Sequence, residues 1–406
     1  MITLGSAVPG QSNEPTKATS VVFLSPGQYD PVSEYWWSLC SDFMEAAAQD
    51  LGIDLRIYYA NRNRALILQQ AKEVVAGPHK PDFIVMQNLK QSALPIIALA
   101  RKHDVKVILF NSGLSQEELL HAGGPRQQYP NWIGEILPDD REAGYLQAKS
   151  LVDRAFEMGL TDPMGKVQML ATAGTMSDTS AIERNHGLMT YVRENQQIVT
   201  LNRDKALPAN WKRDTARKVF QHAFRQYPQT TVVWNANDVQ ALGVREGAIQ
   251  IFDKKPGKDL LIAGIDWNPE NITQIQAGEI LSSIGGHFVE GVWALVLIYD
   301  YANGIDFIEE GVSFKTAMTY LDRDTISEYY QTLELRNRRR IHNIDYKRFS
   351  KIHNPDLQQY SFDTKEILMQ LHTNTRTNIA FILEGSYNNS AMAESVANTL
   401  HIFTQP

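Results

Sequence analysis

Polar and aromatic side chains gather in one loop near the start of the chain, directly after the first apolar run. This loop, residues 25–37, reads Ser-Pro-Gly-Gln-Tyr-Asp-Pro-Val-Ser-Glu-Tyr-Trp-Trp. Aromatic faces can stack on the apolar C–H face of a sugar ring, while Gln28 and Ser33 can bond to its hydroxyls. The competing interpretation makes Ser33 a helix N-cap and two of the aromatics core residues. Of the adjacent Tyr35, Trp36 and Trp37, we expect Trp36 to contact a ligand and Trp37 to pack in the core.

Six further side chains that suit hydroxyl groups follow later strand-like runs. They are Asn111, Arg184, Asn237, Asp238, Asp266 and His287. An amide both donates and accepts, a carboxylate can accept from two adjacent hydroxyls, and a guanidinium presents a planar fork of donors. Each has a structural alternative: a turn for Asn111, an exposed helix position for Arg184, N-caps for Asn237 and Asp238, a cap of the segment after Trp267 for Asp266, and a structural role for His287.

These residues need a scaffold that brings distant strand ends together. Short β-branched or aromatic runs alternate with longer segments of helical spacing, which predicts mostly parallel sheets with crossover helices. The expected strands are 21–24, 55–60, 83–87, 105–111, 166–172, 197–202, 231–235 and 260–265. In open α/β sheets ligands bind beyond the carboxyl ends of the strands, where loops and helix N-termini converge.

The strands fall into two sets of four, separated by a seam near residues 131–140. A strand-like run, 132–137, leads there through Pro138 into a new helix, as expected for a crossover between two lobes of similar architecture. Later we expect a strand at 280–284, a hinge-like Gly285-Gly286-His287, an apolar helix at 288–302 and one strand at 314–321. Residues beyond about 328 could not be placed.

Composition argues against several classes of function. The 406 residues include 43% hydrophobic and 21% charged residues, which suits two ordinary globular lobes. The formal net charge is −7, and the densest basic run, Arg336–Arg340, is local, so nucleic acid is not an expected partner. The single cysteine, Cys40, excludes an internal disulfide and is expected to be a buried small hydrophobe.

The sequence carries neither a membrane-spanning pattern nor the usual enzyme motifs. Its best apolar run, 289–301, is short and contains Glu290 and Asp300, whereas a span needs roughly 20 apolar residues. Residues 1–20 lack a signal-peptide layout, so for a secreted protein we expect the signal to have been removed. GxGxxG, P-loop, HExxH and GxSxG motifs are missing, and we expect no catalysis, cofactor or metal.

Three segments resemble the type I periplasmic binding proteins, in the sugar-binding branch that includes ribose-binding proteins and the autoinducer-2 receptor. They are Pro26-Gly27-Gln28 with the following Val32–Trp36, Asn237–Gly243, and Gly264-Ile265-Asp266. The resemblance covers roughly residues 18–345. It implies an α/β fold of two Rossmann-like lobes with parallel-sheet cores, joined by three crossings near 135–140, 285–288 and 311–314. The expected lobes are 19–137 with 288–312, and 138–287 with 313–345, while the extension 346–406 stays unplaced.

The same resemblance implies roles for individual residues. Trp36 would stack on the ligand; Gln28, Ser33 and Asn111 would bind it from the first lobe, and Arg184, Asn237 and Asp266 from the second. The autoinducer-2 receptor has a second arginine, which balances an anionic borate, where this chain has Gly285-Gly286-His287. A neutral sugar or another small polyol is therefore the expected ligand.

The resulting expectation is a monomeric periplasmic protein that delivers the ligand to a membrane ABC permease. Sensing for a membrane histidine kinase would use the same clamp and stays open as the alternative. A DNA-binding regulator of this fold would need an N-terminal helix pair, which residues 1–20 are too short and polar to provide. A sugar-acting enzyme, such as a glycosidase or transferase, is the rival from another class.

Overall fold

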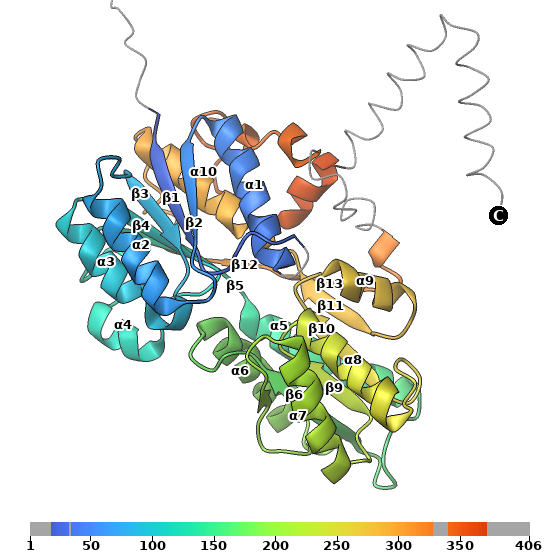
Figure 1. The fold of residues 1–406 in the computed structure, drawn as a ribbon. Helices are drawn as coiled ribbons and strands as arrows, with labels where there is room; N and C mark the ends of the chain where they lie inside the picture. Colours follow the sequence, from blue (N-terminus) through green and yellow to red (C-terminus); the bar gives the residue numbers. More distant parts are fainter. Residues whose placement is uncertain (1–17, 32–33, 328–339, 372–406) are drawn as a thin grey trace, which may run out of the picture.

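A computed structural model describes residues 18–31, 34–327 and 340–371, in which the chain forms two α/β lobes (Figure 1). The first lobe is built on a six-stranded parallel sheet. In spatial order its strands are β12 (Ser313–Thr316), β5 (Trp132–Pro138), β4 (Lys106–Phe110), β3 (Phe83–Met86), β1 (Ser20–Ser25) and β2 (Asp54–Tyr59). Its helices are α1 (Tyr35–Leu51), α2 (Arg64–Ala76), α3 (Ala93–Lys102), α4 (Gln116–Ala122) and α10 (Glu290–Ala302).

The second lobe is built on a separate seven-stranded sheet. Its strands are β13 (Thr319–Asp322), β11 (Ser282–Gly285), β10 (Leu261–Ile265), β9 (Val232–Asn235), β6 (Val167–Ala173) and β7 (Val199–Leu201), with β8 (Leu207–Pro208) beside β6. Its helices are α5 (Asp140–Glu157), α6 (Thr179–Glu194), α7 (Arg213–Gln226), α8 (Asp238–Phe252) and α9 (Pro269–Gln276). In this sheet every pairing of the described strands is parallel except that of β13 with β11. The expected α/β class and the pair of parallel-sheet cores are confirmed.

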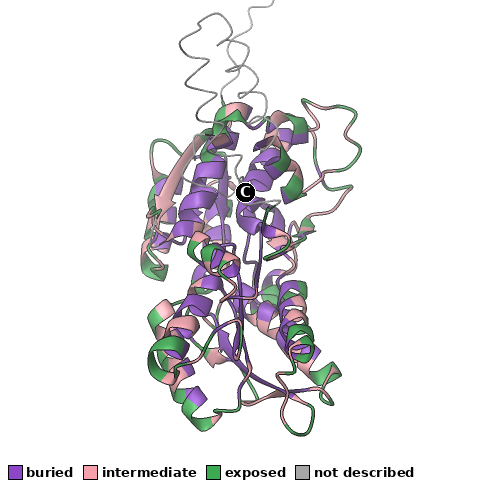
Figure 2. Ribbon diagram, turned by 90° about the vertical axis from the view of Figure 1, so that its right-hand side faces the viewer, coloured by how far each residue is buried: buried purple, intermediate pink, exposed green. Residues whose placement is uncertain are grey.

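The central strands are covered by helices on both faces, which explains their continuous apolar runs. Val21–Leu24, Ile84–Met86 and Ile262–Ala263 are fully buried, and Figure 2 shows buried residues along the strands of both lobes. Helix starts are fixed by side chains: Asn63 caps α2, and Ser115 with Glu118 forms a capping box on α4. Polar loops at the strand ends are therefore held in place by rigid elements.

The chain passes between the lobes at 138–140, at 286–290 and at 317–318. The expected strand at 314–321 is in fact two strands, because β12 pairs with β5 in the first sheet and β13 with β11 in the second. The boundary expected at residue 313 is therefore wrong for residues 313–316. The resemblance implies this third crossing near 311–314, but the chain crosses at 317–318, where Thr316-Ala317-Met318-Thr319 contains no recognisable polar turn.

The final described segment, residues 340–371, returns to the first lobe and packs on α1 and α10. Its Ile341, Tyr346 and Phe349 are buried in the same core as these helices. Residues 340–345 therefore do not belong to the second lobe, contrary to expectation. Most of the basic run 336–340 lies outside the described residues. Among the helices the structure describes, none combines the length and apolar character needed to cross a membrane.

Candidate ligand-binding site

A cleft of about 900 Å³ lies between the lobes, at the carboxyl ends of strands and the N-terminal ends of helices from both. From the first lobe it is lined by Glu34, Tyr35, Trp36, Trp37, Asn61, Arg62, Gln87, Leu89, Lys90 and Asn111. The second lobe contributes Thr175, Asp178, Ser180, Arg184, Asn210, Trp211, Lys212, Arg213, Asp214, Asn237, Val239, Asp266 and Asn268. His287 lines it from the second crossing. The mixture of amides, charged groups and indoles is typical of a site for a small polar ring.

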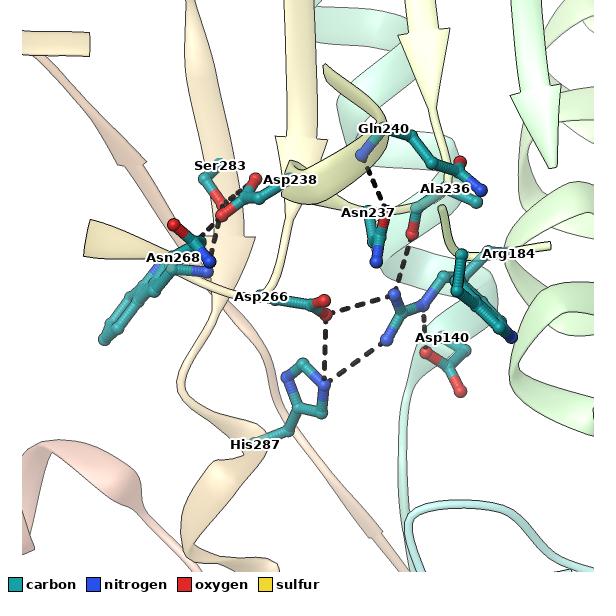
Figure 3. A network of polar contacts seen from close by, with 12 residues as sticks. Asp140, Arg184, Ala236, Asn237, Asp238, Gln240, Asp266, Asn268, Ser283 and His287 are labelled. Carbon is teal, nitrogen blue, oxygen red and sulfur yellow. Dashed lines mark hydrogen bonds and ion pairs between the residues drawn. The ribbon is translucent and has the colours of Figure 1, made fainter. Parts of the chain in front are cut away.

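Arg184, on the first turns of α6, is the centre of the polar network on the second-lobe side (Figure 3). Its Nε donates to Asp140 Oδ1 at 2.7 Å. Nη1 donates to the carbonyl oxygen of Ala236 at 2.8 Å and to Asp266 Oδ1 at 3.2 Å. The side chain is only 3% exposed, whereas that of Asp266 is 17% exposed. Arg184 therefore fixes the carboxylate of Asp266 at the cleft surface.

His287 completes this network as a neutral ring. Burial and the nearby Arg184 charge lower its pKa well below the ordinary value. Arg184 Nη2, which can only donate, lies 3.3 Å from His287 Nε2, so Nε2 accepts and the ring proton lies on Nδ1. Among the described residues, Nδ1 has no hydrogen-bond partner.

Two carboxylates share the single positive charge of Arg184. Burial raises the pKa of Asp266 to about 6, although Arg184 and a hydrogen bond from Asn237 counteract the rise. Burial likewise raises the pKa of Asp140 to about 6, again against the attraction of Arg184. With both carboxylates ionised the group carries one net negative charge, which suits a ligand that donates hydrogen bonds.

Aromatic rings stand on both sides of the cleft. Trp36 lies 4.9 Å from the His287 ring, and its Nε1 has no partner among the described residues. Trp37 is mostly buried and packs edge-on against Trp36 and Phe110. Both indoles line the cleft, and Trp36 is the less buried of the two. The expected contact of Trp36 with a ligand stays a prediction.

Trp211, in the second lobe, is a cleft residue that sequence reasoning missed. Its indole Nε1 donates to Asp178 Oδ2 at 2.9 Å, and its ring lies 5.6 Å from Arg184 Cζ. Gly174 makes room for it, because a Cβ there would lie 2.2 Å from the indole. The sequence feature that could have predicted a cleft position for Trp211 is a tryptophan in an otherwise polar segment just before α7.

The two lobes also touch directly, beside the cleft. The Thr179 hydroxyl lies 2.6 Å from that of Ser112 and donates to the Gly113 carbonyl oxygen at 2.9 Å. We call Thr179 and its partners Ser112 and Gly113 the interlobe contact. These bonds join the start of α6 to the end of β4, so they depend on how far the lobes are closed.

Seven of the ten expected site residues line the cleft. They are Tyr35, Trp36, Asn111, Arg184, Asn237, Asp266 and His287. Asn111 has a left-handed backbone, with φ of 63°, and is 8% exposed. Asn237 caps α8 through Oδ1, which accepts from the Gln240 amide at 3.0 Å. Ser33 lies outside the described residues.

Asp238 is a correction, because it does not line the cleft. Its carboxylate is fully buried and accepts from Ser283 Oγ, from Asn271 Nδ2 at 2.8 Å and from the Asn268 amide at 2.7 Å. Asn237 and Asp238 are adjacent at the start of α8, so their side chains leave the backbone in different directions. Asp238 ties α8 to the loop before α9 and to β11, and it is not available to a ligand.

Gln28 does not line this cleft, and its expected ligand contact stays a prediction. The loop around it is held against α1 by Tyr29, whose hydroxyl donates to Asp42 Oδ1, and by Asp30, whose amide donates to Ser38 Oγ. Loop geometry of this kind depends on contacts that spacing does not reveal.

Among the described residues, no three His, Cys, Asp or Glu side chains are grouped as metal ligands.

Solved structures that resemble this chain include periplasmic sugar-binding proteins. A structure of a periplasmic sugar-binding protein from Pseudomonas fluorescens has 33% sequence identity and a TM-score of 0.75, over 86% of this chain and 99% of that chain. The periplasmic binding protein component of the arabinose ABC transporter from Shewanella sp. ANA-3, bound to α- and β-L-arabinofuranose, has 19% identity and a TM-score of 0.65, over 78% and 96%.

A curated relative is more distant in sequence. The D-allose-binding periplasmic protein of Escherichia coli (strain K12) is 23% identical over 205 residues, which are 50% of this chain and 60% of that protein. A family model described as periplasmic binding protein domain matches residues 29–306, more than half of the chain. With its two parallel-sheet lobes and the cleft between them, the chain thus belongs to the periplasmic binding proteins.

Proposed function

We propose that the chain captures a neutral sugar or small polyol in its interlobe cleft, without catalysing a reaction. The observation that carries this proposal is the Asp266 carboxylate, fixed by Arg184 at 3.2 Å and 17% exposed at the cleft. A carboxylate held in this way can accept two hydroxyl hydrogen bonds at little cost in side-chain entropy. Trp36 and Trp211 supply apolar faces for the C–H side of a ring.

The charges around the cleft favour a neutral ligand. Arg184 is shared by Asp140 and Asp266, and Arg62 pairs with Glu34 at 2.8 Å. His287 is neutral and therefore adds no positive charge that could balance an anionic ligand. Because these cations already have carboxylate partners, a phosphate or borate ester would compete with ion pairs that the protein has built.

The ligand is delivered, in this proposal, to a membrane ABC permease on the periplasmic side. Support comes from the relatives: one is named as an ABC transporter component bound to arabinofuranose, another as an allose-binding periplasmic protein. Sensing for a membrane kinase would use the same cleft and differ in the docking partner.

Calorimetric titration with D-allose, D-ribose, L-arabinose and myo-inositol tests the proposal. We expect one of them, or a sugar identified by native mass spectrometry of the purified protein, to bind in the micromolar range or tighter. Asp266→Asn should weaken that binding, whereas the matched control Asp153→Asn, in an exposed ion pair with Lys149 on α5, should not. Retained affinity in Asp266→Asn would contradict the assigned site, and turnover of the bound sugar would identify an enzyme.

A further inference from the structure

The segment 340–371 is attached to the first lobe by specific polar contacts as well as by its apolar residues. Asp50, at the end of α1, accepts from the amides of Tyr346 at 2.8 Å and Lys347 at 3.2 Å. Asp300, buried in α10, accepts from the Lys351 amide at 2.7 Å and from the Tyr360 hydroxyl at 2.9 Å. These contacts hold the segment in one register along α1 and α10.

The far end of this segment reaches the second crossing between the lobes. The Thr364 hydroxyl donates to the Gly286 carbonyl oxygen at 3.0 Å, and Thr364 is only 5% exposed. Gly286 has φ of 97°, a conformation that favours glycine, and a Cβ there would lie 3.2 Å from the Thr364 methyl. The crossing is therefore shaped on one side by a residue 78 positions later in the chain.

The next residue after Gly286 is His287, which lines the cleft. The carbonyl that Thr364 holds belongs to the peptide linking these two residues, so its orientation fixes where the histidine ring begins. The ring in turn lies 3.3 Å from Arg184 Nη2 and 3.6 Å from Asp266 Oδ1. A continuous set of contacts thus runs from the C-terminal segment into the polar network of the cleft.

We propose that Thr364 is a positioning residue for ligand recognition, which fixes the Gly286–His287 peptide and thereby the histidine in the cleft. This inference rests on the proposed function. It makes the segment 340–371 part of the binding machinery and not only a cover for α1 and α10.

The test compares Thr364→Val, which keeps the shape and removes the hydroxyl donor, with Thr364→Ser, which keeps the donor. Tyr360→Phe is the matched control, because it removes another hydroxyl donor of the same segment, the partly buried one bound to Asp300. The first readout is the ring resonances of His287 in ligand-free, ¹³C-histidine-labelled protein, assigned by their loss in His287→Asn. The second is affinity for the sugar that binds the wild-type protein.

We expect Thr364→Val to shift or broaden the His287 resonances and to weaken binding about two- to tenfold, the size of one hydrogen bond. Thr364→Ser should restore both, and Tyr360→Phe should lower the melting temperature while leaving both unchanged. Unchanged His287 resonances in a folded Thr364→Val protein would overturn the proposal. Failure of the wild type to bind any sugar would refute the proposed function alone, because the resonances are measured without ligand.

Discussion

Replacing Asp266 by Asn tests two effects of this carboxylate separately: its hydrogen bonds to ligand hydroxyls, and the free energy that its burial costs the folded protein. The substitution keeps the shape, removes the charge and turns one acceptor into a donor. If Asp266 accepts charge-assisted bonds from ligand hydroxyls, the loss is about 1.5–3 kcal/mol, or roughly tenfold to a hundredfold in affinity. Calorimetric titration of both proteins with the same sugar measures it.

The same substitution should increase the stability of the ligand-free protein, although it weakens ligand binding. Folding raises the pKa of Asp266 from 3.8 to about 6, a rise that corresponds to on the order of 3 kcal/mol against the ionised folded state. At pH 7 the carboxylate is ionised in both folded and unfolded chains, so this cost is fully present. Asp266→Asn removes it, while Arg184 keeps its 2.7 Å bond to Asp140. We therefore expect the variant to be more stable than the wild type at pH 7.

The pH dependence gives the sign of this effect. Because the folded pKa is raised, the folded state binds the proton more tightly, and the contribution of Asp266 to wild-type stability falls as pH rises from 3.8 through about 6. The stability difference between Asp266→Asn and wild type should thus be largest above pH 6 and vanish below 3.8. Urea unfolding between pH 4 and 8 checks it. A variant less stable than wild type at pH 7, or one with unchanged affinity, would refute the reasoning.

Three further expectations concern other parts of the site. Trp36→Ala should weaken sugar binding by about 1–3 kcal/mol in calorimetry with little change in melting temperature, and a large drop in melting temperature with affinity retained would make Trp36 a core residue. Asp238→Ala should lower the free energy of unfolding by about 2–4 kcal/mol in urea titrations, because Ser283, Asn271 and the Asn268 amide lose their acceptor; an unaltered stability would contradict its structural role. Small-angle scattering should show a smaller radius of gyration with bound sugar, and Thr179→Val, which removes the interlobe contact, should give a larger one without ligand.

Features that depend on local pattern could be predicted from the sequence. The apolar runs at Val21–Leu24 and Leu261–Ile265 place the loop that leads to Trp36, and Asp266 itself, at strand ends, and parallel strands bring those ends to the same edge of a sheet. Asn111 and Arg184 reach the cleft for the same reason. Alternation of strands and helices was therefore sufficient to gather most of the site.

Features that depend on loop conformation could not be predicted. Trp211 follows β8, only two residues long, and both Asn210 and Trp211 have left-handed backbones, with φ of 53° and 62°. The position of Gln28 depends on the hydrogen bond from Tyr29 to Asp42, which holds its loop against α1. Residue spacing does not reveal that bond. Whether two adjacent residues at a helix start face a ligand or a neighbouring strand, as Asn237 and Asp238 do, depends on φ and ψ at one position.

The repeated passage of the chain between the lobes determines the order in which a growing polypeptide can finish each of them. Within the described part of the chain, the second lobe is nearly contiguous and takes only strand β13 from beyond residue 285. The first lobe begins at β1, yet its edge strand β12 ends at Thr316. The described segment that packs on α1 and α10, residues 340–371, comes later still. The half of the protein that comes first in the chain is thus the last to complete its core, and the apolar faces of α1 and α10 that residues 340–371 cover stay open until that segment is available.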